Sequence, residues 1–208
     1  MSDSPRPPRP RLPLRERKKL HTRRTIADAA FALAVEHGVD GVLVEEIAER
    51  AFVSPRTLSN YFPSKEAAIV AAGEDDLSLL ADALLERPAD ESPITSLRTL
   101  LSAGVRGWTP DEIVALRAKE RLIDEHPALL PHRMAQYDGL EDAIRVAIAQ
   151  RMGLDPETAP HPRLVAGAAV SVVKTAIRVW VRQEGDEPSI ADMVESGFDD
   201  LEAGLVPD

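Results

Sequence analysis

The side chains best suited to specific polar contacts are concentrated in one short segment, residues 54–65. Five of them would lie on a single short helix: Arg56, Thr57, Ser59, Asn60 and Tyr61. Arginine and asparagine can form bidentate pairs with base edges, and the hydroxyl groups of threonine, serine and tyrosine reach bases or phosphate oxygens. The same residue types also suit an ordinary solvated helix face, so their meaning depends on the elements that carry them.

The elements around this segment fit a helix-turn-helix. Ser54-Pro55 combines an N-cap residue with proline at the first helical position, and it predicts a helix over 55–61. A short helix is expected just before it, over 44–51, and a longer first helix over about 15–37, ending at Gly38. When two helices are joined by such a tight turn, the second one can enter the major groove of DNA.

The other side of the same segment is apolar. Six residues can fill a small core shared with the first helix: Ile47, Ala48, Ala51, Val53, Leu58 and Phe62. The polar residues of 55–61 would then face outward. Directly afterwards, Pro63-Ser64 predicts another helix start, where the first amides and the Lys65 ammonium could hold a backbone phosphate together.

The charge distribution agrees with a phosphate contact at the N-terminal end. The formal net charge of the chain is −10, but residues 1–70 sum to +3 and the remainder to −13. The first 24 residues hold nine basic and two acidic side chains, and their prolines predict a disordered basic arm over 1–14. A basic end on an acidic chain is expected if only that end meets phosphates, although a solvated basic tail gives the same pattern.

The stretch from Arg15 to Ile69 resembles the DNA-binding domain of TetR-family transcriptional regulators. Three runs carry the resemblance: SPRTLSNYFPSKEAAI (Ser54–Ile69), EEIAERA (Glu45–Ala51) and the basic lead RERKKLHTRRTI (Arg15–Ile26), which contains Arg23. The resemblance implies an all-α fold of nine or ten helices. It places a three-helix helix-turn-helix DNA-binding domain over 15–62 and a regulatory and dimerisation domain over 63–208.

The resemblance also implies a function: a homodimer that binds a double-stranded DNA operator and is released from it by a small-molecule effector. Arg56, Thr57, Ser59 and Asn60 match the recognition-helix surface of the family, and Tyr61 and Lys65 match phosphate-contacting positions. A repressor of a palindromic operator is the favoured interpretation. A ligand-binding or interaction protein that has lost operator binding is the alternative.

Three residues depart from the family pattern. Leu43 stands where the family usually has a threonine that caps the second helix and touches phosphate, so that contact is in doubt. Phe52 occupies a turn position that is often glycine. Ala34 stands where many relatives have a core phenylalanine, and Phe31 or Phe52 is a candidate to supply the missing volume.

The rest of the chain is a series of helices bounded by prolines and glycines. The helix that begins at 65 is expected to continue to about 86, connecting the DNA-binding domain to the regulatory domain. Further helices are expected over 93–107, 110–125, 128–152, 161–184 and 188–204. Small residues within 161–184 suit a symmetric helix–helix interface, although simple core burial requires the same composition.

An effector pocket is expected among the helices of residues 93–184. Six residues are candidates to line it or to anchor a polar ligand: Trp108, Arg117, Arg121, Met134, Tyr137 and Arg178. Pockets are mostly apolar with few polar anchors, but a scattered aromatic residue is more often part of a core.

Several other classes of protein are disfavoured. The chain has no cysteine, which excludes disulfides, thiol nucleophiles and cysteine–zinc sites, and which suits a cytoplasmic protein. No secretory signal is evident, and the longest apolar run, Leu164–Val173, is too short to span a bilayer. His126 and His132 lack the spacing of a helical metal pair, and no catalytic signature is found, so neither an enzyme nor a metal or cofactor site is expected.

Overall fold

The computed structural model describes residues 14–73, 77–183, 185 and 187–205. Within these residues the chain forms ten α-helices and one short 3-10 helix, which confirms the predicted all-α fold. In chain order they are α1 (Leu14–Gly41), α2 (Val44–Arg50), α3 (Pro55–Tyr61), α4 (Lys65–Val70), α5 (Leu77–Leu85), α6 (Pro93–Arg106), α7 (Pro110–Glu125), η1 (Pro127–Leu129), α8 (Leu130–Met152), α9 (Pro160–Arg182) and α10 (Ile190–Glu202). Apart from its last residue, Leu14, the predicted arm over 1–14 lies outside the described residues.

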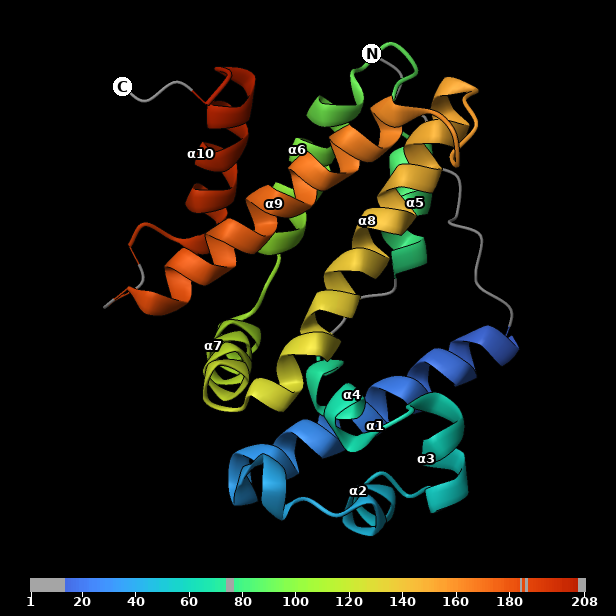
Figure 1. Cartoon of the computed structure of the whole chain (residues 1–208), viewed down its shortest axis with the longest axis vertical. Coiled ribbons are helices and arrows are strands. Elements are labelled where there is room, and N and C mark those ends of the chain that lie inside the picture. The colour runs from blue at the N-terminus through green and yellow to red at the C-terminus, as the bar shows by residue number, and fades with distance from the viewer. Residues whose placement is uncertain (1–13, 74–76, 184, 186, 206–208) are drawn as a thin grey trace, which may run out of the picture.

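Helices α1–α4 form one end of the molecule, the head, and α5–α10 form the larger body (Figure 1). Each part has its own apolar core. The head core is built from α1–α4, but it also takes Leu122, Ile123 and Leu129 from α7 and η1. The body core is built mainly from α5, α6, α8, α9 and α10. Apolar packing therefore continues from the head into the body.

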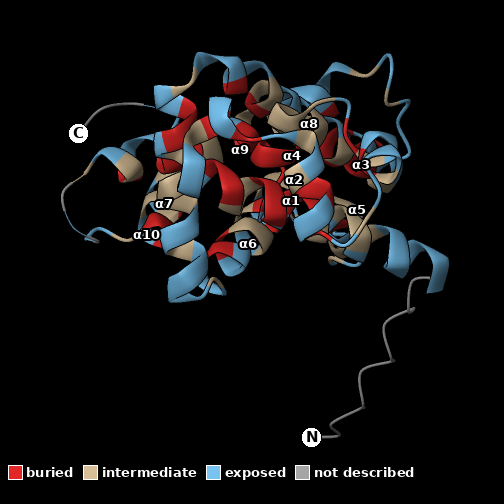
Figure 2. Cartoon of the chain, turned by 90° about the horizontal axis from the view of Figure 1, so that it is seen from below, coloured by how far each residue is buried: buried red, intermediate tan, exposed pale blue. Residues whose placement is uncertain are grey.

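Helix α1 is the central element of the head. Its residues Ile26, Ala30, Leu33 and Ala34 follow a helical spacing and are each at most 4% exposed. Figure 2 shows buried residues along α1. The regular helix breaks at Gly38, as predicted, where φ is 75° and ψ is 158°, and a short helical turn continues to residue 41. Glycine adopts this positive φ without a Cβ clash.

The prediction of one continuous helix over 65–86 is wrong. Helix α4 ends at Val70, and α5 begins only at Leu77. Between them Gly73 has a φ of 68°, a left-handed conformation that does not continue an α-helix. A single rigid helix from Lys65 into the body is thereby excluded.

Helix α4 is part of the head core. Its residues Ala68, Ile69 and Val70 are each at most 1% exposed and pack in the same cluster as α1. The predicted domain boundary between residues 62 and 63 stays a prediction, but apolar packing in the head continues beyond it.

The later helices agree with their predicted ranges to within two residues at each end. Among the described helices, α9 is long and apolar enough to cross a membrane by composition alone, with a mean hydropathy of 1.6 over its most apolar window. It packs against α6, α7, α8 and α10. Its residue Trp180 is 1% exposed, and Phe198 of α10 is fully buried in the same body core.

A polar network around Glu91 joins the connection between α5 and α6 to helices α6 and α8. The Glu91 carboxylate accepts hydrogen bonds from Arg87 Nε at 2.7 Å and from Ser96 Oγ at 2.6 Å. Arg151 of α8 donates to Ser96 Oγ and to the Glu91 carbonyl, each at 2.6 Å. The bonds from Arg87 and then Ser96 lower the pKa of Glu91 from its ordinary 4.5 to about 2.

We expect Glu91→Gln to lower thermal stability at neutral pH. Because the pKa of Glu91 is depressed in the folded state, the carboxylate stabilises the fold fully above about pH 4.5, and this contribution is lost as the pH falls toward 2. Unfolding midpoints of wild type and variant, measured from about pH 7 to about pH 3, should therefore converge at the acidic end. Glu125→Gln, at an exposed position on α7, is the control. A difference that stays constant with pH contradicts the assignment.

Candidate nucleic-acid interface

Helix α3 is a two-turn helix with a fixed start. Ser54 Oγ accepts a hydrogen bond from Thr57 N at 3.0 Å, and Pro55 occupies the first helical position. This bond satisfies an amide that has no partner within the helix. At the other end, Phe62 N donates to the Leu58 carbonyl at 3.0 Å. The predicted Ser-Pro start and the range 55–61 are confirmed.

The helix has one buried and one exposed face. Leu58 is 2% exposed and lies in the head core with Phe62, whereas Arg56, Ser59 and Asn60 are exposed. The other residues predicted for this core are also found in it or packed against it: Ile47, Ala48, Ala51 and Val53. The apolar side thus anchors α3, and the polar side is left to solvent.

The polar residues differ in how far they are available. Thr57 is half-buried, and its Oγ1 lies 2.8 Å from the Oγ of the capping Ser54. Ser59 Oγ donates to the Pro55 carbonyl at 3.1 Å. Tyr61 is half-buried and packs against the head core. Of the five predicted contact residues, Arg56, Ser59 and Asn60 are therefore the exposed ones, and the Ser59 hydroxyl is bonded within the helix.

Lys65 lies at the start of α4, but its ammonium is bound to the end of α1. Its Nζ donates to the carbonyl oxygens of Val39 and Val42, both at 2.9 Å, and of Asp40 at 3.3 Å. An ammonium has three donors, which match these three acceptors. The sequence predicted that this ammonium holds a phosphate. In the structure the ammonium fastens the segment before α2 to the start of α4, and the phosphate contact stays a prediction.

Helix α2 is held by carboxylates at both ends. The Leu43 N–H donates to Glu46 Oε2 at 3.1 Å, while the Leu43 side chain is 56% exposed and has no hydroxyl to offer a phosphate. At the other end, Arg50 forms a bidentate pair with Glu36 of α1 at 2.8 and 2.7 Å. The bonds from Arg50 lower the pKa of Glu36. The second helix is thus fixed without the usual threonine.

The aromatic residues of the head lie in different environments. The Arg23 guanidinium lies 4.5 Å from the centroid of the Phe62 ring, a cation–π contact at the edge of the head core. Phe31 is half-buried and packs against this core, which contains Ala34, so it remains a candidate for the missing volume. The same suggestion for Phe52 is wrong, because its side chain is 95% exposed on the turn before α3, where φ is 55°.

The six residues predicted to line an effector pocket lie in different places. Trp108 lines a cavity of about 390 Å³ between α1 and α7. Met134, Tyr137 and Arg178 line a depression of about 40 Å³ beside α8 and α9. Arg117 lies 4.0 Å from the ring centroid of Trp180, and Arg121 is exposed. In the described part of the chain, these six residues are not gathered in one cavity.

The cavity beside Trp108 includes residues that sequence reasoning missed. Arg24, Asp28 and Phe31 of α1 line it, and their spacing places them on one helix face, so part of the signal was present. On the other side it is lined by five residues of α7: Asp111, Glu112, Ala115, Leu116 and Lys119. Only the packing of α1 against α7 brings the two sets together.

Comparison with known proteins agrees with this geometry. Residues 26–72 match the family described as bacterial regulatory proteins, tetR family, and residues 91–206, more than half of the chain, match the MftR C-terminal domain of TetR type. The chain belongs to the TetR family. Its head is therefore the DNA-binding helix-turn-helix domain of a TetR-family transcriptional regulator.

Relatives and solved structures support the family over most of the chain. The TetR-family chain is 30% identical to the regulator TcmR of Streptomyces glaucescens over 202 residues, which cover 94% of this chain and 89% of that protein. It is 33% identical to the transcriptional repressor KstR of Rhodococcus jostii over 173 residues, covering 83% and 79%.

The fold is shared with a TetR regulator from Rhodococcus sp. RHA1, with a TM-score of 0.55, 21% identity and coverage of 90% and 100% of the two chains. It is also shared with Thermus thermophilus FadR in complex with lauroyl-CoA, with a TM-score of 0.51, 23% identity and coverage of 89% and 96%.

We expect Phe52→Gly to stabilise the TetR-family head by up to about 1 kcal/mol. A left-handed φ costs a non-glycine residue about 1–2 kcal/mol, part of which is offset by the greater chain entropy of glycine in the unfolded state. The exposed ring contributes almost no burial. Urea unfolding measures the effect. Phe52→Ala is the matched control, since it removes the ring but keeps the strained φ, and equal stabilities of the two variants contradict the explanation.

Proposed function

We propose that the protein is a repressor that binds a palindromic DNA operator as a homodimer and is released by a small-molecule effector. The observation that carries the proposal is the arrangement of α3, whose apolar side is buried while Arg56 and Asn60 are exposed on the other. This is the arrangement of a recognition helix in the major groove. The 33% identity to a protein named as a repressor supports repression as the outcome.

The contact residues take different roles in this proposal. Arg56 and Asn60 read base edges, since both can form bidentate pairs and both are exposed. Thr57, Ser59 and the Tyr61 hydroxyl contact phosphates or bases near the cap of α3, and Arg23 approaches the DNA backbone from the N-terminal half of α1. Lys65 acts by positioning: its ammonium keeps the start of α4 against the end of α1.

The homodimer would form through α9 and α10. A groove of about 550 Å³ lies between these helices and contains small residues such as Ala168, Ser171 and Gly197. Val179 in this groove is 52% exposed and Leu205 is 67% exposed. Two copies that cover these faces about a two-fold axis would present two heads to half-sites about 34–36 Å apart, or a multiple of that spacing.

The effector would act by preferring one arrangement of the two heads. It can weaken DNA binding only by its differential affinity for the two arrangements. A protein that binds operator DNA in this way works in the cytoplasm, where the DNA is.

We expect Arg56→Ala and Asn60→Ala each to weaken binding to a selected operator and to relax base preference, at a cost of about 1–3 kcal/mol. Operators are selected from a randomised duplex pool, and affinities are measured by fluorescence anisotropy. Arg121→Ala, at an exposed arginine of the body, is the control for charge alone. Wild-type affinity should fall steeply as salt rises, because counterions are released. If no duplex is bound at low salt, the protein has lost operator binding, which is the alternative function.

We expect Val179→Glu to produce monomers and to abolish operator binding. The substitution places a charge on the exposed apolar side of α9 within the proposed interface. Val114→Glu, at a valine of α7 that is 67% exposed, is the control and should leave the dimer intact. Analytical ultracentrifugation measures the oligomeric state. A dimeric Val179→Glu protein contradicts the assigned interface.

A further inference from the structure

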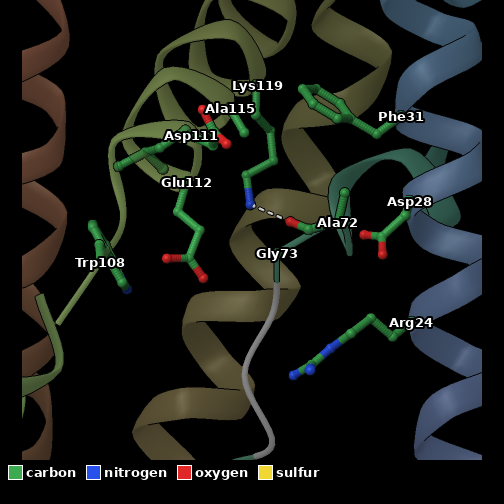
Figure 3. A pocket seen from close by; sticks show the side chains of 11 residues that line it. Arg24, Asp28, Phe31, Ala72, Gly73, Trp108, Asp111, Glu112, Ala115 and Lys119 are labelled. Atoms are coloured by element: carbon green, nitrogen blue, oxygen red, sulfur yellow. Dashed lines mark hydrogen bonds between the residues drawn. The ribbon is translucent and has the colours of Figure 1, made fainter.

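A cavity of about 390 Å³ lies between the head and the body (Figure 3). Arg24, Asp28 and Phe31 of α1 form the head side, and Trp108 and Leu116 form part of the body side. Phe31 packs against the head core, whereas Trp108 and Leu116 pack against the body core. The cavity therefore lies at the junction of the two cores, and its size falls in the range of small-molecule sites.

The cavity combines an aromatic lining with carboxylates. Asp28 and Glu112 reach it from opposite sides, on α1 and on α7 (Figure 3). Glu112 Oε2 accepts hydrogen bonds from Thr109 N at 2.7 Å and from Thr109 Oγ1 at 2.9 Å, and these bonds lower the pKa of Glu112. Burial raises the pKa of Asp28, and the Arg24 guanidinium offsets this only in part.

The acidic side chains that line the cavity outnumber the basic ones, so its net charge stays negative. Asp28, Asp111 and Glu112 line it together with two basic residues, Arg24 and Lys119. The Lys119 ammonium is buried and donates a hydrogen bond to the Ala72 carbonyl at 2.8 Å, so it already has a partner in the turn that follows α4. A positively charged ligand group would pair with the carboxylates, and it would also be attracted by the faces of Phe31 and Trp108.

We propose that this junction cavity binds a small organic cation, an apolar or aromatic molecule carrying a protonated amine, with the amine between Asp28 and Glu112. The apolar part of the ligand lies against Phe31, Trp108 and Leu116. Only the expected effect of the ligand on DNA binding rests on the proposed function. Binding of the cation itself does not. The cavity differs from the pocket expected within the body, because one of its walls belongs to the head.

A ligand bound in this cavity would change the position of the recognition helix. Ala72 lies in the cavity wall, and its carbonyl is held by Lys119 of α7. Gln136 of α8 holds the Val70 carbonyl in the same way, with its Nε2 at 3.0 Å. A ligand bound between α1 and α7 displaces α1. Because α2 and α4 pack against α1, the angle of the head relative to the body changes.

The test uses three probes of one shape: 2-phenylethylamine as the cation, 2-phenylethanol as the neutral analogue and phenylacetate as the anion. Binding to the full-length protein is measured by calorimetry and by the shift of the unfolding midpoint. We expect the cation to bind at least about tenfold more tightly than the other two. Asp28→Asn and Glu112→Gln should each weaken binding of the cation about tenfold.

The variants are chosen to keep the fold. Glutamine at position 112 can still accept the Thr109 N–H bond at the start of α7, and asparagine has the shape of Asp28. Asp138→Asn, at an exposed position on α8, is the control and should bind like wild type. Equal binding of the three probes, absence of cation binding, or variants that bind like wild type would overturn the proposal.

The DNA assay separates the two proposals. If the cation binds through Asp28 and Glu112 but no duplex is bound, the site stands and the operator function fails. If a duplex is bound and the cation releases it from wild type but not from Asp28→Asn, both stand. If a duplex is bound and the cation has no effect on it although it binds, the coupling through α1 is overturned.

Discussion

The packing of α1 decides where the recognition helix lies relative to the rest of the molecule. Its buried stripe, from Ile26 to Ala34, packs with α2, α3 and α4, and the same core takes Leu122, Ile123 and Leu129 from the body. A close-packed core transmits displacement rather than absorbing it. The stripe is made mostly of small side chains, which allow neighbouring helices to pack closely against α1.

The second constraint on the head is the interruption of helices at glycine residues. Helical structure is interrupted at Gly38 and at Gly73, both of which have a positive φ. A lysine side chain from another helix donates to a backbone carbonyl next to each interruption: Lys65 at the first and Lys119 at the second. Both lysines thereby join elements that are distant in sequence. The conformation of the head depends on these bonds as well as on apolar packing, and one of them lies in the wall of the junction cavity.

The proposed DNA interface around α3 and the proposed ligand site in the junction cavity differ in the surroundings of their charged groups. The interface around α3 is exposed, so its side chains meet a partner in water, where single charge pairs contribute little and many contacts must act together. In the junction cavity, partial burial raises the pKa of the Asp28 carboxyl, although the residue is still exposed. A charge that is partly desolvated gains more from one partner than a charge in open water does. An acidic body therefore does not conflict with a head that binds DNA.

The sequence by itself determined the features that depend on local interactions. The caps and prolines placed the start of α3 at Pro55, and the helical spacing of apolar residues identified the head core, because both signals act within a few residues. Four features were decided only by tertiary structure: the hydrogen-bond partners of Lys65, the break after α4, the exposure of Phe52 and the dispersal of the six pocket candidates. A lysine ammonium or an aromatic ring takes whichever partner the fold brings near. That partner is set by helices far along the chain, which local sequence does not encode.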